Sequence, residues 1–131
     1  RALTQRGIRV CIHLINGLPG ETEDMMLETA SAVGLLRPGG VKNHLLHVLS
    51  GTRLAREWEN GAVPTLTREE YIRIVCRQLL RLPPETVVER LTGDGAKEFL
   101  LAPLWSRDKI AVLGGIDRFL AEHNLCQGCL F

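Results

Sequence analysis

The sequence has no apolar run long enough to cross a membrane. A spanning helix needs about 20 consecutive apolar residues, and no segment of the 131-residue chain contains such a run. The first six residues, Arg1 to Arg6, also lack the apolar stretch of a signal peptide. We therefore expect a protein that has no membrane partner.

The sequence also has little net charge and few cysteines. A formal net charge of +1 does not provide the strongly basic face that is typical of nucleic-acid-binding domains. Four cysteines in 131 residues do not suggest the disulfide framework of a small secreted protein. The 45% of apolar residues is enough for a core. We expect a globular domain in the cytoplasm.

The first fifty residues predict a strand, a helix and a second strand. Apolar and polar residues alternate from Gly7 to Ile15, with the period of a strand. The segment Asn16 to Glu21 contains Pro followed by Gly, which is typical of a type II turn. Thr22 is the predicted N-cap of a helix, and Val41 to Leu49 is the second predicted strand. The short loops between these elements favour a parallel βαβ unit.

The remainder of the chain has a more helical pattern. Helices are predicted from Arg53 to Asn60, from the capping box at Thr67 to about Leu80, and from near Ser106, the last with Ile110, Leu113, Ile116 and Leu120 on its buried stripe. Thr86 to Leu91 is a predicted third strand. We expect residues 1–60 to form one part and residues 61–131 to form an α-rich extension that packs on it.

The predicted strands are too few for a complete parallel sheet. Parallel strands leave unpaired edges, and natural parallel sheets are covered on both faces. Moreover, the chain begins with Arg1 and not with methionine. We therefore expect an α/β fold in which this chain supplies the end of a barrel or a larger sheet, with the missing strands upstream.

Candidate binding residues follow the predicted strands. In βα barrels the functional residues lie on the loops at the carboxyl ends of the strands, which here selects Asn16 to Glu21 and Ser50 to Thr52. Gly17 and Gly20 would let a ligand approach the backbone, and the Glu21 carboxylate could accept hydrogen bonds from hydroxyl or amino groups. The alternative is a tight turn that only joins strand to helix.

Polar side chains alternate along both strands. Arg9, Cys11 and His13 share one side of the first strand, and this side would face the lumen of a barrel. Lys42 and His44 share one side of the second strand, whereas His47 points the other way. The alternatives are a hydrogen-bonded core histidine and a solvated strand edge.

A Cys-x-x-Cys pair, Cys126 and Cys129, lies near the end of the chain. A structural zinc site needs a second pair of ligands, and only His123 is nearby. We expect a loose tail. A small zinc-binding or redox module that uses these three residues is the alternative.

Longer segments resemble a known family. Gly7 to Glu21, with the sequence GIRVCIHLINGLPGE, resembles the fifth strand and following loop of a radical S-adenosylmethionine (SAM) barrel. Gly40 to Thr52 resembles the sixth strand, and Pro83 to Gly95 and Leu101 to Trp105 are similar to the tail of a bacterial subgroup related to the Elp3-like branch. The resemblance extends to about Asn124.

This resemblance implies a partial (βα)6 barrel, a [4Fe–4S] cluster and SAM as cofactors. By position, Asn16, Gly17, Gly20 and Glu21 would lie by the methionine and ribose of SAM. The segment His47, Val48 and Leu49 would lie by the adenine. His13, Lys42 and His44 would line the lumen as the catalytic candidates, facing a substrate whose class, RNA or small molecule, stays open.

The sequence departs from the family in one respect. The family's cluster motif, three cysteines near the start of the barrel, is missing, and Cys126 and Cys129 supply only two thiolates. We therefore assign no metal ligand to this chain and expect the cluster ligands to lie in a partner segment, the rest of the barrel. The chain alone should be inactive. An α/β interaction domain that has lost its cofactor is the alternative from another class.

Overall fold

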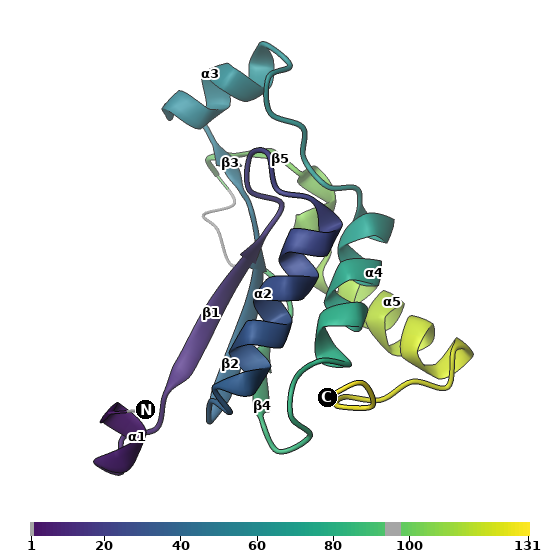
Figure 1. Ribbon diagram of the computed structural model, residues 1–131. Helices are drawn as coiled ribbons and strands as arrows, with labels where there is room; N and C mark the ends of the chain where they lie inside the picture. Colours follow the sequence, from purple (N-terminus) through teal and green to yellow (C-terminus); the bar gives the residue numbers. More distant parts are fainter. Residues whose placement is uncertain (1, 94–97) are drawn as a thin grey trace.

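The computed structural model describes residues 2–93 and 98–131, and it places three parallel strands at its centre (Figure 1). The strand order is β1–β2–β4, and both pairings are parallel. The three strands are β1 (Cys11–Asn16), β2 (Gly40–Leu45) and β4 (Val87–Arg90). The predicted βαβ unit and the predicted third strand are therefore confirmed.

The other elements are helical, apart from one short strand pair. They are α1 (Ala2–Gln5), α2 (Glu23–Leu35), β3 (Val48–Leu49), α3 (Arg53–Glu59), α4 (Arg68–Leu79), β5 (Leu100–Ala102), the 3₁₀ helix η1 (Leu104–Arg107) and α5 (Lys109–Glu122). None of the described helices is long and apolar enough to span a bilayer.

Helix α2 begins where the sequence predicts. The Thr22 side chain accepts a hydrogen bond from the Met25 amide, which satisfies one of the free N–H groups of the first turn. The buried side of the helix carries Met26, Ala30 and Val33, as their spacing predicts. These residues cover one face of the sheet.

Helix α4 forms the centre of the core. Thr67 and Glu70 make the predicted capping box, in which each side chain accepts a hydrogen bond from the other's backbone amide. The predicted stripe of Tyr71, Val75 and Leu79 is buried, at 0%, 0% and 5% exposure. The main hydrophobic cluster joins this stripe to side chains from β1, β2, α2 and α5.

Helix α5 packs through only part of the predicted stripe, in which Ile116 is buried and Leu120 packs against the core. Ile116 is buried, but Ile110 is 85% exposed and Leu113 is 43% exposed, and the second buried apolar residue is Val112. The two helices approach closely at Gly115, where a Cβ would lie 2.4 Å from Ile72 Cδ1 of α4.

The second predicted strand is broken. Residues Val41 to Leu49 form β2, which ends at Leu45, and β3, which begins at Val48. Strand β3 leaves the parallel sheet and pairs antiparallel with β5, Val48 opposite Ala102. The predicted strand is broken because its last two residues, Val48 and Leu49, pair with the distant strand β5 and not with the parallel sheet.

The C-terminal tail is docked on the core. The Gly128 amide donates to the Leu79 carbonyl at 3.1 Å, and the Leu130 amide donates to the Leu80 carbonyl at 2.9 Å. The Phe131 ring lies under the Arg37 guanidinium, 5.0 Å from ring centroid to Cζ. The expectation of a loose tail is therefore wrong.

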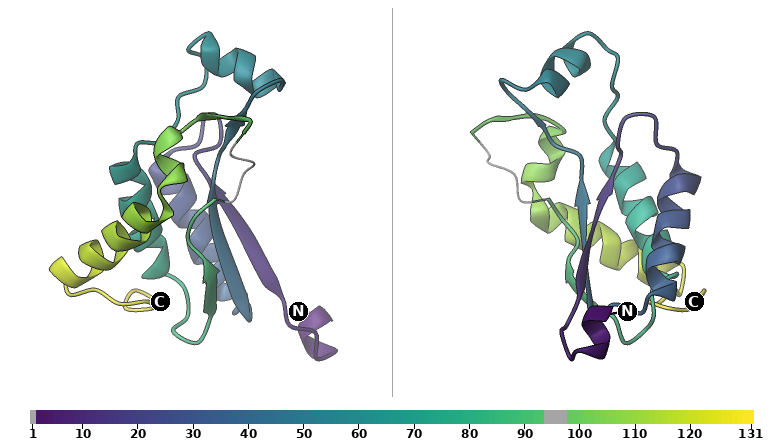
Figure 2. Two further views of the ribbon diagram at one scale, coloured as in Figure 1. Left: turned by 180° about the vertical axis from the view of Figure 1, so that it is seen from behind. Right: turned by 60° about the vertical axis from the view of Figure 1, so that its left-hand side comes forward.

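Among residues 2–93 and 98–131, helices cover one face of the sheet and leave the other open. Figure 2 (left) views the sheet from the side opposite α2 and α4, and in that view no helix lies across β1 and β2. The boundary expected at residue 60 does not divide the core, since β4 belongs to the same sheet as β1 and α4 belongs to the same cluster. One face of the sheet is thus packed against helices, and the opposite face is open.

Candidate functional site

The open face of the sheet carries two of the three candidate catalytic residues in contact. The parallel register places His13 opposite Lys42 and Ile15 opposite His44. The imidazole rings of His13 and His44 stack, with centroids 5.6 Å apart and an interplanar angle of 27°. The alternation read from the sequence therefore places His13, Lys42 and His44 on one surface.

Charged groups lie beside this imidazole pair. The Glu89 carboxylate on β4 lies 2.9 Å from the Arg9 guanidinium and 3.4 Å from Lys42 Nζ. Partial burial and the nearby Glu89 carboxylate raise the pKa of the Cys11 thiol.

The loop after β1 has the turn geometry that its sequence predicts. The Glu21 amide donates to the Leu18 carbonyl at 3.0 Å, and the Glu21 carboxylate accepts from the Leu18 amide at 3.2 Å. Gly20 has a φ of 78°, which the third position of a type II turn requires. The main chain and the carboxylate of Glu21 thus both bond Leu18 and hold the loop in its turn conformation.

The same loop borders an open groove. Gly17 packs against Leu66, which a Cβ would approach to 3.1 Å, whereas nothing lies within 4 Å of a Cβ built at Gly20. A cavity of about 550 Å³ is lined by Gly17, Leu18, Pro19, Gly20, Glu21, Ala62, Pro64, Thr65, Leu66 and Glu70. The free space at Gly20 and the adjoining cavity leave the backbone near Gly20 accessible to a ligand.

Asn16 lies on the other side of the sheet from the candidate catalytic residues. Its side chain is 2% exposed and exchanges two hydrogen bonds with Gln78, of 2.9 and 2.8 Å. Gln78 also accepts from Asn43 at 3.0 Å and donates to the Met26 carbonyl at 3.1 Å. The Asn16 side chain therefore holds β1 to α4, and the predicted cofactor contact of this side chain has no support in the structure.

Sequence reasoning missed Gln78. A glutamine on the buried stripe of a helix is the signal that could have found it, because buried amides need partners.

His47 lies just beyond the carboxyl end of β2. Its ring packs against Gly93, where a Cβ would lie 2.5 Å from His47 Cε1. Burial lowers the pKa of His47, with smaller contributions from His44 and Lys109. Its Nε2 atom is buried and has no hydrogen-bond partner among residues 2–93 and 98–131.

Val48 and Leu49 follow in β3. Val48 is fully buried in a small cluster with Ala55 and Ala102. The Val48 side chain therefore serves packing, and only the main chain of this residue is available for the predicted adenine contact.

The described residues contain no metal site. Within residues 2–93 and 98–131, no three His, Cys, Asp or Glu side chains converge on a point that could hold a metal ion. All four cysteines are free thiols.

Comparison with known proteins gives the family. The model described as the Radical_SAM C-terminal domain matches residues 38–122. Protein YtqA of Bacillus subtilis is 47% identical over 129 residues, and protein YhcC of Escherichia coli K12 is 36% identical over 121 residues. These alignments cover 98% and 92% of the chain but only 40% and 39% of the two relatives.

A solved structure supports the same conclusion at the level of the fold. The chain is similar to the archaeal Elp3 of Methanocaldococcus infernus, with a TM-score of 0.82 and 20% sequence identity, over 95% of this chain and 29% of that one. The family model covers well over half of the sequence. The chain belongs to the radical SAM family, of which it carries the C-terminal domain.

Proposed function

We propose that this chain is the C-terminal part of a radical SAM enzyme, in which it supplies part of the SAM pocket and one wall of the substrate cavity. The observation that carries the proposal is the open sheet face. Its polar side chains, His13, Lys42 and His44, lie on the face that the helices leave uncovered. A parallel sheet with one bare face needs further structure to cover it.

The loop after β1 is the proposed contact for the methionine and ribose groups of SAM. Gly20 leaves the backbone open to a ligand, and Glu21 holds the loop closed through the Leu18 amide. The main chain of His47, Val48 and Leu49, beyond the end of β2, is the proposed contact for adenine. SAM with a reduced [4Fe–4S] cluster supplies carbon-centred radical chemistry in this family.

The residues on the open face have separate proposed roles. The stacked imidazoles of His13 and His44 can donate hydrogen bonds to a substrate or accept them from it. Lys42 carries a positive charge next to the Glu89 carboxylate and can orient an anionic group of the substrate. The substrate, RNA or a small molecule, is not assigned.

The proposed partner is an upstream segment that completes the barrel and holds the cluster. The chain spans about 40% of the length of the relatives that it matches, and the described residues offer no set of three ligands. We propose the cytoplasm as the compartment, because four cysteines in 131 residues do not suggest a disulfide framework.

The proposal is tested with the longer protein that contains this chain. The purified, anaerobically reconstituted protein is given SAM and a reductant, and 5′-deoxyadenosine is measured. We expect Glu21→Gln to lower its formation at least fivefold, because the neutral amide is a weaker acceptor for the Leu18 amide and for SAM.

Glu85→Gln is the matched control. Glu85 is an exposed glutamate that pairs with Arg37 near the amino end of β4, away from the proposed pocket, and we expect it to keep wild-type rates. A reconstituted protein that binds neither cluster nor SAM would instead support a non-catalytic interaction domain.

A further inference from the structure

The Cys-x-x-Cys pair lies in a hydrogen-bonded turn. The Cys129 amide donates to the Cys126 carbonyl at 3.3 Å. Gly128 occupies the third position of this turn with a φ of 81°, as a type II turn requires. Both cysteines are exposed free thiols, so reagents in solution can reach them.

This turn brings the two cysteines within the range of a disulfide. The first and fourth Cα atoms of a β-turn lie less than about 7 Å apart. Disulfides join cysteines whose Cα atoms are about 4.4–6.8 Å apart. The Cα separation that the turn imposes on Cys126 and Cys129 therefore overlaps the range that a disulfide spans.

The core holds the turn in place. Gln127 Nε2 donates to the Pro83 carbonyl at 2.7 Å and to the Thr86 carbonyl at 2.8 Å. Gly128 packs closely on Pro84, since a Cβ there would lie 2.6 Å from Pro84 Cγ. With these contacts fixed, the two thiols have less conformational freedom to lose than they would in a free tail.

We propose that Cys126 and Cys129 form a reversible dithiol–disulfide pair that exchanges with low-molecular-weight disulfides. One thiolate attacks the small disulfide, forms a mixed disulfide and releases one small thiol. The second thiolate then attacks the protein sulfur, closes the Cys126–Cys129 bond and releases the second small thiol. The protein loses two electrons and two protons, and the small disulfide gains both. The pair acts independently of the proposed SAM chemistry.

The other two cysteines do not take part. Cys76 is fully buried, and burial raises the pKa of its thiol to about 12. Cys11 lies on the open face of the sheet, in β1, which is the strand farthest from the C-terminal tail along the sequence. Neither thiol lies in a turn with a second cysteine.

The test is a glutathione redox titration. The 131-residue protein and a synthetic peptide of residues 125–131 are equilibrated with mixtures of reduced and oxidised glutathione, then quenched in acid. Peptide mapping by mass spectrometry measures the fraction with a Cys126–Cys129 bond. We expect the protein to close this bond with an effective thiol concentration at least tenfold above that of the peptide, and to reopen it with dithiothreitol.

Two variants make the result specific. Cys126→Ser should instead accumulate a glutathione adduct on Cys129. Gln127→Ala, which removes the contacts to Pro83 and Thr86, should lower the effective concentration at least threefold. Closure in the protein no better than in the peptide, glutathione adducts on both cysteines of the wild type, or an unchanged Gln127→Ala variant would overturn the proposal.

Discussion

The side-chain amide of Gln78 connects two strands and two helices. It bonds Asn16 at the end of β1, Asn43 in β2 and the main chain of Met26 in α2. All three amide side chains are at most 2% exposed, so water cannot replace a lost partner. Because Asn16 directly precedes the Gly17 to Glu21 loop, Gln78 fixes the point from which that loop starts.

Replacing Gln78 with leucine should strongly destabilise the protein. The substitution preserves approximate volume but leaves the Asn16 and Asn43 amides without their partner, and unpaired buried polar groups cost about 1–3 kcal/mol each. We expect the free energy of unfolding in urea to fall by about 2–5 kcal/mol. Gln5→Leu, at an exposed position of α1, is the control. It should change the free energy of unfolding by less than about 0.5 kcal/mol. Equal effects of the two variants would refute the role given to Gln78.

The sequence identified the turn at Asn16 to Glu21 correctly but not the direction of the Asn16 side chain. The Pro-Gly pair defines the turn locally, and the observed φ of Gly20 agrees with it. The Asn16 side chain is directed by Gln78, which is 62 residues away. A contact over that distance has no local signal. The alternation of His13 and His44 was predictable because it follows from strand period alone.

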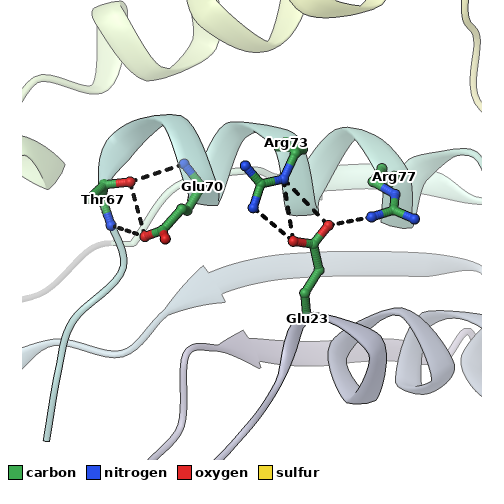
Figure 3. Close-up of polar contacts among 5 residues, drawn as sticks. All are labelled: Glu23, Thr67, Glu70, Arg73 and Arg77. Atoms are coloured by element: carbon green, nitrogen blue, oxygen red, sulfur yellow. Dashed lines mark hydrogen bonds and ion pairs between the residues drawn. The ribbon is translucent and has the colours of Figure 1, made fainter.

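At the scale of elements, an ion-pair cluster joins the start of α2 to α4. Figure 3 shows the Glu23 carboxylate between the guanidinium groups of Arg73 and Arg77, beside the capping box of Thr67 and Glu70. The hydrogen bond from Arg73 lowers the pKa of Glu23, and Arg77 acts in the same direction, whereas burial opposes both. Two helices far apart in the sequence are thereby held side by side.

Glu23→Gln should lower stability in a pH-dependent way. The folded-state pKa of Glu23 is depressed below its ordinary value of 4.5. The stabilisation that the ionised Glu23 carboxylate provides is therefore complete at pH values above 4.5. It is lost as the pH falls through the folded-state pKa. We expect the free energy of unfolding of Glu23→Gln, measured in urea, to be about 1 kcal/mol lower than that of the wild type at pH 7. This difference should disappear at low pH.

Glu57→Gln is the control for this cluster. It removes an exposed i,i+4 pair with Arg53 and should cost at most about 0.5 kcal/mol. A Glu23→Gln variant whose deficit persists unchanged at pH 3 would show that the charge is not responsible.

Element boundaries were predictable where local chemistry sets them. The N-caps at Thr22 and Thr67 follow from sequence, and both are present. The division of Val41 to Leu49 was not predictable, because the run contains no Gly or Pro that would mark a break. The strand β5, which pairs with the end of the run, lies some fifty residues later. The exposure of Ile110 and Leu113 in α5 was not predictable either, because their spacing on the helix is the same as that of the residues that pack on the core.

At the scale of the whole molecule, the uncovered sheet face is the observation on which the proposed function depends. One face of the sheet is packed under helices, and the other carries His13, Lys42 and His44. The described residues hold no group of three metal ligands. Under the proposed function, this chain works as part of a larger barrel whose other strands bring the cluster.

The most direct measurement is the iron and sulfide content of the purified 131-residue chain after anaerobic reconstitution, with the longer protein treated in parallel. The account predicts that the chain alone remains colourless and binds no stoichiometric iron, while the longer protein gains the absorbance of a [4Fe–4S] cluster. A stable [4Fe–4S] spectrum from the 131-residue chain alone would contradict it.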